Sequence, residues 1–483
     1  MKLKSNNLRN KAISGMIWKL SEKIGMQLVQ LIIQIVLARI LMPEEYGLVG
    51  LLTIFISIAD VFILQGFTTA LIQKKNADEL DYSSVFYANL IMSALLYIAL
   101  FTVSPAVAWF YKDERLTALM RILSLNVLLG AFSAVHNAIM QKKLEFKKSF
   151  VRNISNIFTQ GIVGITAAIM GAGAWALVLS KLAGTLVGSV VICSTVKWKP
   201  SRTFSLSRIK VLFKYSSNLL GTNLLNTVFN NMHSIIIGRF FSKAELGFYQ
   251  RGQQIPQVAM TAIDGSLSEV LYPTLSILQN DKERLKSALR RTMKTSMFIA
   301  LPLMAGLTAI AEPLTILLLT DKWLPSVPFM QLSCVVCMFW PLQARGQALN
   351  AIGKSNVTFK LSLVSKAITL VMIVLCIRLG IYTIMIGTII AAGIGMLITS
   401  YYVKKHIGYT YMEFIIDMLP IVFISAIMFA LVLIIGRINF NVPIKLIVQV
   451  LVGIISYVIL SKLFKVDSEQ YIENIIKSIL KRK

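Results

Sequence analysis

Apolar residues occur along this chain in runs that are long enough to cross a membrane. A helix needs about 20 residues to cover roughly 30 Å of hydrocarbon, and the sequence offers fourteen such windows. Their approximate centres are Gln27, Ala59, Leu96, Leu128, Val163, Leu182, Thr227, Met260, Leu303, Val336, Thr369, Thr388, Ile424 and Ile454. The pattern predicts an all-α integral membrane protein with about fourteen transmembrane helices and almost no room for a soluble domain.

Two short motifs occur twice in the same order, which indicates an internal repeat. The turn at residues 39–47 recurs at 239–247 with three identities, at a shift of 200. The segment 137–147 recurs at 350–360 with five identities, at a shift of 213. Each pair falls six predicted helices apart. Because six is an even number, the repeats are expected to be parallel and related by an axis along the membrane normal.

The repeat divides the chain into two predicted six-helix lobes and a C-terminal extension. The N-terminal lobe comprises residues 1–196 with helices 1–6, and a basic cytoplasmic linker follows at 197–214. The C-terminal lobe comprises residues 215–403 with helices 7–12. Helices 13 and 14, at 404–464, have no repeat partner. Residues 465–483 form a basic amphipathic cytoplasmic tail, interpreted either as an interfacial helix on the inner leaflet or as a frayed end.

The Lys and Arg residues are distributed unevenly between the two predicted sides of the membrane, which indicates the orientation of the chain. The formal net charge is +27 with 49 Lys and Arg, a balance that also occurs in nucleic-acid-binding proteins. Predicted inner segments carry 33 of these residues, outer loops carry nine, and seven lie within membrane windows. This asymmetry follows the positive-inside rule and predicts that both termini are cytoplasmic. Anionic lipid head groups are therefore expected partners, and nucleic acid is not.

The sequence contains no catalytic or metal-binding signature. Cys334 and Cys337 have C-x-x-C spacing, but no second pair or histidine cluster accompanies them, so they are interpreted as small apolar residues of a helix. Nucleophile elbows, phosphate-binding loops and zinc motifs are absent from the sequence. We therefore expect a transporter rather than an enzyme, without a metal or a cofactor.

Polar residues form stripes along predicted helices 1, 2, 7 and 8. At 100° per residue, each stripe covers one side of its helix, and polar side chains within a bilayer are informative because they are unfavourable there. The stripes predict a shared hydrated cavity; the alternative is hydrogen bonding between neighbouring helices. The residues predicted to line the cavity are Lys19, Lys23, Gln27, Gln30, Asn223, Asn226, Asn230, Arg251, Gln254 and Gln257.

Three acidic residues accompany these stripes. Asp60 lies near the middle of predicted helix 2, and Asp264 and Glu269 lie on predicted helix 8. A carboxylate at the bilayer midplane is unfavourable by about 2.5–3.5 kcal/mol on insertion scales, unless it faces water or a partner. These residues are the candidates for ion coupling.

The stretch LARILMPEEYGLVGLLTIF at residues 37–55, together with GRFFSKAELGFYQRGQQIP at 238–256, resembles the polysaccharide-exporter family of the MOP flippase superfamily. The branch it resembles includes O-antigen, colanic-acid and teichuronic-acid flippases. The resemblance covers nearly the whole chain. It implies two six-helix lobes around a central cavity lined by helices 1, 2, 7 and 8.

The resemblance also implies a cargo and a location. Members are expected to move undecaprenyl-pyrophosphate-linked oligosaccharides from the inner to the outer leaflet of the bacterial cytoplasmic membrane. Glycosyltransferases and a polysaccharide polymerase are the protein partners expected with such a cargo. The sugar, the oligomeric state and the choice among protons, sodium ions and membrane potential as the driving force are left open.

Roles for individual residues follow from the chemistry of such a cargo. Lys19, Lys23 and Arg251 suit a pyrophosphate, while the Gln and Asn side chains suit sugar hydroxyls. The residues expected to form an outer gate are Arg39, Glu45, Arg239 and Glu245. Two alternatives remain: a cation-coupled multidrug exporter of the same superfamily, which the Lys and Gln content of helix 1 disfavours, and a membrane scaffold protein that transports nothing.

Overall fold

The computed structural model describes residues 25–464 and 466, apart from residues 75 and 144. The side chains of residues 65, 146, 215, 262, 264–270 and 272–274 are also outside the described part. Within the described ranges every regular element is a helix and no strand occurs. The prediction of an all-α protein is confirmed.

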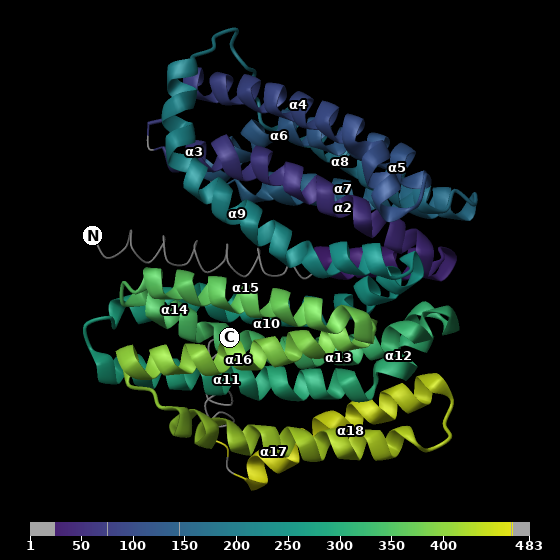
Figure 1. The fold of residues 1–483 in the computed structure, drawn as a ribbon, viewed down its shortest axis with the longest axis vertical. Helices are drawn as coiled ribbons and strands as arrows, with labels where there is room; N and C mark the ends of the chain where they lie inside the picture. The colour runs from purple at the N-terminus through teal and green to yellow at the C-terminus, as the bar shows by residue number, and fades with distance from the viewer. Residues whose placement is uncertain (1–24, 75, 144, 465, 467–483) are drawn as a thin grey trace. The chain divides into compact units, whose positions relative to one another are not determined.

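By its internal contacts the chain forms two compact units, Met1–Gly247 and Phe248–Lys483. Figure 1 shows α4, α6 and α8 side by side in the first unit. The described helices of the first unit are Gly25–Ile40, α2 (Pro43–Phe62), η1 (Ile63–Phe67), α3 (Thr68–Gln73), α4 (Glu79–Tyr111), α5 (Arg115–Leu123), α6 (Leu125–Lys142), α7 (Phe146–Ile169), α8 (Ala174–Thr195) and α9 (Leu206–Phe240).

The second unit begins within α10 and contains the remaining helices. In this unit α11 packs against α17, and α17 packs against α18. Its elements are α10 (Lys243–Ile277), α11 (Lys282–Ala309), α12 (Ala311–Leu319), η2 (Asp321–Ser326), α13 (Val327–Cys337), η3 (Trp340–Gln343), α14 (Ala344–Ala351), α15 (Ser355–Cys376), η4 (Ile377–Leu379), α16 (Ile381–Ile407), α17 (Tyr411–Gly436) and α18 (Val442–Leu463).

Many of these helices are long and apolar enough to cross a bilayer. Among the described residues nine qualify, or ten if α11 and α12, which meet at a bend of 69°, form one broken span. Each of the fourteen predicted window centres lies within a helix. Helices α7, α9 and α10 are long enough to span, but they carry polar residues and do not qualify by composition. The chain is therefore a multi-pass membrane protein, and fourteen crossings remain a prediction.

The division into two units does not coincide with the predicted linker. Helix α9, which follows residues 197–205, packs against α2, η1 and α4 and belongs to the first unit. The predicted lobes at 1–196 and 215–403 were drawn from the repeat, whereas the two units are defined by contacts. The repeat-based boundaries, including those of the extension at 404–464, remain a prediction.

The predicted linker is attached to the start of α4. The backbone N–H of Ser201 donates to the Ser83 hydroxyl at 2.9 Å, and that of Ser205 donates to the Ser84 hydroxyl at 3.0 Å. The buried carboxylate of Asp81 forms ion pairs with Lys74 and Arg208. Beside it, the backbone N–H of Asp81 holds the pKa of Asp78 below its usual value. Arg208 therefore connects the start of α9 to the start of α4.

Candidate functional site

The two copies of the first repeated motif form the same helix start. Glu45 accepts a hydrogen bond from the backbone N–H of Met42 at 2.7 Å, immediately before α2. Glu245 accepts one from the backbone N–H of Ser242 at 2.8 Å, immediately before α10. A carboxylate in the first turn satisfies an unpaired N–H and interacts favourably with the helix dipole. Helix capping thus explains the repeated glutamate.

The repeated glycines explain how closely the two helix starts approach. A Cβ atom on Gly47 would lie 1.8 Å from the backbone carbonyl oxygen of Lys243. A Cβ atom on Gly247 would lie 2.0 Å from the backbone carbonyl oxygen of Pro43. All four residues belong to the first unit. The contact is reciprocal, and it requires glycine at both positions because no carbonyl can occupy the space of a side chain.

Charged side chains surround this helix crossing. Lys243 Nζ donates to the carbonyl oxygen of Tyr111 at 2.6 Å. Arg115 pairs with Asp113 at 2.8 Å and also with Glu44. Partial burial would raise the pKa of Asp113, but hydrogen bonds from the side chain and backbone of Arg115 outweigh it and place that pKa below its usual value. Arg239 lies 5.0 Å from the centre of the Phe110 ring.

The predicted outer-gate residues therefore lie near the contact between the starts of α2 and α10. Glu45 and Glu245 are helix caps, Arg39 is exposed at the end of the helix Gly25–Ile40, and Arg239 lies in the last turn of α9. Their role as a gate remains a prediction.

Asp60 lies just before an interruption in its helix. Residues Ile63–Phe67 form a π-helical turn in which Gly66 has non-helical backbone angles. Such π-turns occur frequently at functional sites. Asp60 interacts electrostatically with Lys181 of α8. Sequence reasoning missed Lys181, although a single lysine inside the apolar stretch Ala174–Thr195 is a detectable signal.

Among the described residues, none of those predicted to line the cavity is fully buried, and neither is Asp60. Gln30, Asn230 and Gln257 are exposed, and the half-buried members are Gln27, Asp60, Asn223, Asn226, Arg251 and Gln254. Lys19 and Lys23 lie outside the described residues, as do the side chains of Asp264 and Glu269.

The structure brings some of the stripe residues into contact. The Arg251 guanidinium donates to Gln254 and lies 5.9 Å from the centre of the Trp323 ring. Gln257 donates to Gln253 at 3.3 Å. The stripe on α10 thus contains hydrogen-bonded pairs along its own helix, and its predicted role in binding a cargo remains untested.

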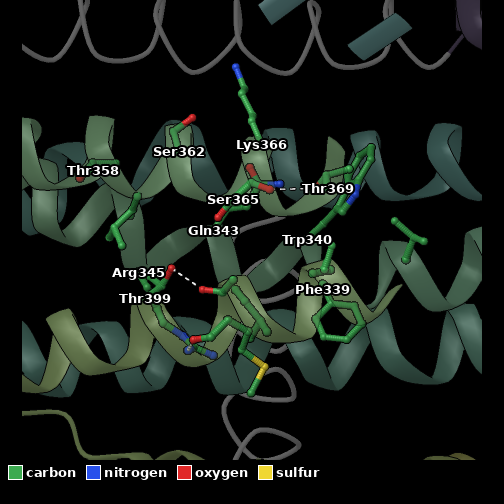
Figure 2. Close-up of a pocket in the computed structure, with 18 of the residues that line it drawn as sticks. Phe339, Trp340, Gln343, Arg345, Thr358, Ser362, Ser365, Lys366, Thr369 and Thr399 are labelled. Atoms are coloured by element: carbon green, nitrogen blue, oxygen red, sulfur yellow. Dashed lines mark hydrogen bonds between the residues drawn. The ribbon is translucent and has the colours of Figure 1, made fainter. Parts of the chain in front are cut away.

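A groove that the sequence did not predict lies within the second unit, where η3 and α13–α16 meet, and its largely apolar lining carries several polar side chains. Its volume is about 580 Å³. Figure 2 shows Ser362, Ser365 and Thr369 along α15, with Arg345 and Thr399 across the groove. Among the described residues of its lining, Arg345 and Lys366 are cationic and none is acidic. These polar residues are spread over α14, α15 and α16, so no single helical stripe contains them.

The predicted role of the cysteine pair is confirmed. Cys334 and Cys337 are buried in α13 among Met260, Ala300 and Met304, where they form part of an apolar core. They pack as small apolar side chains.

A family model described as polysaccharide biosynthesis protein matches residues 36–328, which is more than half of the chain. The protein belongs to this family. The predicted resemblance is thereby confirmed, and the matched range begins just before the motif at residues 37–55.

Two curated proteins illustrate the relationship. The chain is 24% identical over 315 residues to the succinoglycan biosynthesis transport protein ExoT of Rhizobium meliloti (strain 1021), covering 65% of this chain and 64% of ExoT. It is 27% identical over 305 residues to the teichuronic acid biosynthesis protein TuaB of Bacillus subtilis (strain 168), covering 62% of this chain and 63% of TuaB. The matches thus span slightly less than two thirds of each relative. The name of ExoT describes a transport protein, in agreement with the predicted transporter class.

A solved structure shows the same fold. The chain superposes on the lipid II flippase MurJ in its inward closed conformation with a TM-score of 0.75, covering 94% of this chain and 99% of MurJ at 18% identity. At that identity the likeness concerns the fold alone.

Proposed function

We propose that this protein moves a lipid-linked oligosaccharide from the inner to the outer leaflet of the bacterial cytoplasmic membrane. The observation that carries the proposal is the exposure of the amide side chains of Gln30, Asn230 and Gln257 on helices that the sequence predicts to cross the membrane. An amide exposed to hydrocarbon is unfavourable unless it meets water or a polar partner. Their exposure supports a hydrated path for sugars, and the family supports a saccharide cargo.

The mechanism we propose is alternating access, with the polyprenyl tail remaining in lipid while the polar head group crosses along the stripes. Lys19, Lys23 and Arg251 bind the pyrophosphate, and Asp60 carries the coupling ion. Hydrogen bonding to Gln254 and the nearby Trp323 ring support a defined position for the Arg251 guanidinium. An inside-negative potential adds about 2.3 kcal/mol per 100 mV for each negative charge that moves outward.

Asp60→Asn and Arg251→Ala are each expected to lower export at least tenfold while leaving membrane insertion intact. The first removes the titratable charge, and the second removes the cation that binds the pyrophosphate. The measurement is flipping of a lipid-linked oligosaccharide in proteoliposomes that contain the full chain. Arg378→Ala is the matched control, because Arg378 is exposed in η4 and lies outside the stripes.

Full export by both variants would disprove the two residue assignments. Transport of cationic drugs by the wild-type protein, without transport of lipid-linked saccharides, would instead favour the multidrug alternative.

Cysteines introduced at Asn226, Asn230 and Gln257 are expected to react with a membrane-impermeant thiol reagent, after the four native cysteines have been replaced. A cysteine at Leu225, which is 52% exposed on the apolar side of α9, is the control and is expected to react at least tenfold more slowly because it faces lipid. Equal, slow reaction at all four positions would favour a scaffold without a hydrated path.

A further inference from the structure

The groove in the second unit contains a buried arginine whose hydrogen-bonding capacity is only partly used. Arg345 is 2% exposed. Its Nη1 donates to the Ser400 hydroxyl and to the carbonyl oxygen of Met396 at 3.4 Å. The guanidinium carbon lies 4.3 Å from the centre of the Phe414 ring. Nε and Nη2 donate no hydrogen bond to any described residue.

Such a guanidinium favours an anionic ligand. A buried charge is strongly unfavourable without a partner of opposite sign, and the described lining of the groove contains no carboxylate. Guanidinium also presents several N–H groups in a fixed fork, which matches the oxygens of a phosphate or carboxylate. Ser400 and Phe414 contact the guanidinium from outside the groove lining, and Nε and Nη2 are buried, so an anion in the groove reaches these nitrogens only after a local movement of the Arg345 side chain.

The rest of the lining suits a polar head group attached to an apolar chain. Hydroxyls of Ser362, Ser365 and Thr369 line one side of the groove along α15 (Figure 2). Phe339 and Trp340 add apolar surface at its other end. The outer surface of α15 is also apolar, with Val371 55% exposed.

One end of the groove lies near the predicted cytoplasmic ends of its helices, and the other reaches the predicted window centres Thr369 and Thr388. Its lining includes Asn350 and Thr358, which flank the turn between α14 and α15. The positive-inside pattern places this turn on the cytoplasmic side. A ligand in the groove is therefore expected to come from the inner leaflet.

We propose that this groove binds the phosphate-bearing head group of an inner-leaflet lipid, with Arg345 as its buried anchor. Two lipids share this chemistry: a polyprenyl pyrophosphate and an anionic glycerophospholipid. The first would make the groove a loading site for the cargo and rests on the proposed function. The second would make it a structural or regulatory lipid site and does not.

The test is lipid binding to the full chain in a neutral detergent, measured by native mass spectrometry. The probes are undecaprenyl pyrophosphate, phosphatidylglycerol and, as a neutral reference, diacylglycerol. Wild-type protein is expected to bind at least one of the two phosphate lipids in preference to diacylglycerol. Arg345→Gln is expected to weaken that binding at least tenfold. Lys360→Gln, which removes one charge from an exposed position of α15 outside the groove, is expected to bind as wild type.

The pattern of binding identifies the lipid. Arg345-dependent binding confined to undecaprenyl pyrophosphate supports a cargo-loading site, and Arg345-dependent binding of phosphatidylglycerol supports a phospholipid site. Unchanged binding by Arg345→Gln, or no preference of the wild type for phosphate lipids, would overturn the proposal.

A second variant separates binding from folding. Ser362→Phe narrows the groove and leaves Arg345 and the net charge unchanged, so it is expected to weaken the same binding while eluting as wild type in size-exclusion chromatography. Retained binding by folded Ser362→Phe would contradict the groove as the site. Flipping by the wild-type chain is a separate readout: absent flipping contradicts the proposed function, while Arg345-dependent lipid binding can still support the head-group site.

Discussion

Gly47→Ala is expected to destabilise the protein by at least about 3 kcal/mol, the upper part of the range for overpacking. The added Cβ atom would lie 1.8 Å from a backbone carbonyl oxygen of Lys243. A flexible side chain could rotate away from such a contact, but this carbonyl is held in the first turn of α10. The two helix starts must therefore separate. Gly247→Ala is expected to act in the same direction, because its Cβ atom would meet the Pro43 carbonyl oxygen at 2.0 Å.

The measurement is the free energy of unfolding in a detergent titration from a mild detergent to dodecyl sulfate. Gly130→Ala is the matched control, since Gly130 is helical and a Cβ atom there would have nothing within 4 Å. The control is expected to be neutral or to stabilise by up to about 1 kcal/mol through helix propensity. Equal losses in Gly47→Ala and Gly130→Ala would show that the crossing does not require glycine.

Asp417→Asn is expected to destabilise the second unit by about 3 kcal/mol. This value is at the lower end of the range for breaking a buried ion pair, because the partner cations Arg290 and Lys294 are partly exposed. The Asp417 side chain is 2% exposed and accepts two hydrogen bonds from Arg290, each 2.7 Å long. Lys294 approaches it at 3.1 Å, and the Tyr409 hydroxyl donates to it at 2.9 Å. Asparagine keeps the shape but removes the negative charge that Arg290 and Lys294 share, and Arg290 keeps only the longer pair with Glu413 at 3.6 Å.

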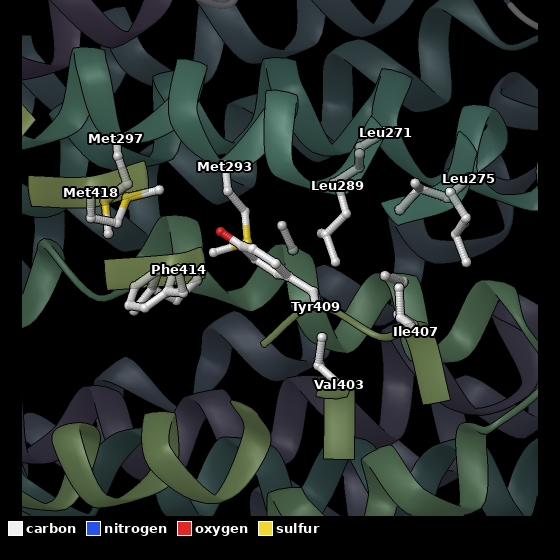
Figure 3. Close-up of a cluster of buried hydrophobic side chains, with 14 of the residues drawn as sticks. Leu271, Leu275, Leu289, Met293, Met297, Val403, Ile407, Tyr409, Phe414 and Met418 are labelled. Carbon is white, nitrogen blue, oxygen red and sulfur yellow. The ribbon is translucent and has the colours of Figure 1, made fainter. Parts of the chain in front are cut away.

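The residues around Asp417 explain why Asp417→Asn should also weaken the packing of the neighbouring core. Figure 3 shows Tyr409 among buried side chains that include Leu289, Met293 and Phe414. The Asp417 carboxylate thus orients the Tyr409 ring within this core and joins α17 to α11. Both the unfolding free energy and the thermal midpoint of the purified chain measure the effect.

Glu413→Gln provides the comparison for Asp417→Asn. Glu413 lies one helical turn earlier, its side chain is 29% exposed, and it pairs with Lys286 at 2.8 Å. Glutamine can keep the hydrogen bond to Thr410 that caps α17. A loss of about 1 kcal/mol or less is expected, as for exposed ion pairs. A loss as large as that of Asp417→Asn would contradict the importance of burial.

Several structural features follow from short stretches of sequence. Each predicted window centre, from Gln27 to Ile454, lies in a helix, because length and apolar composition are local properties. The repeat in residues 39–47 and 239–247 corresponds to a real structural equivalence: Glu45 and Glu245 cap their helices in the same way. Capping depends on residues three positions apart, so a sequence can display it directly.

Other features depend on residues that are distant in sequence. The interaction of Lys181 with Asp60 depends on the position of α8 near Asp60. The groove likewise depends on the packing of α14, α15 and α16 against one another. Similarly, α9 belongs to the first unit through its packing against α2 and α4, although the repeat predicts a boundary before it.

By itself, then, the sequence determined the membrane class, the helices, the repeat and the family, since these rest on hydrophobic runs, charge asymmetry and local motifs. Only the tertiary structure decided why Gly47 must be glycine, which charge interacts with Asp60, and that Arg345 is buried without an acidic partner in the described part of the chain. Each of these depends on which helices approach one another. Neither a backbone carbonyl at 1.8 Å nor the lack of a nearby carboxylate can be seen in a linear pattern.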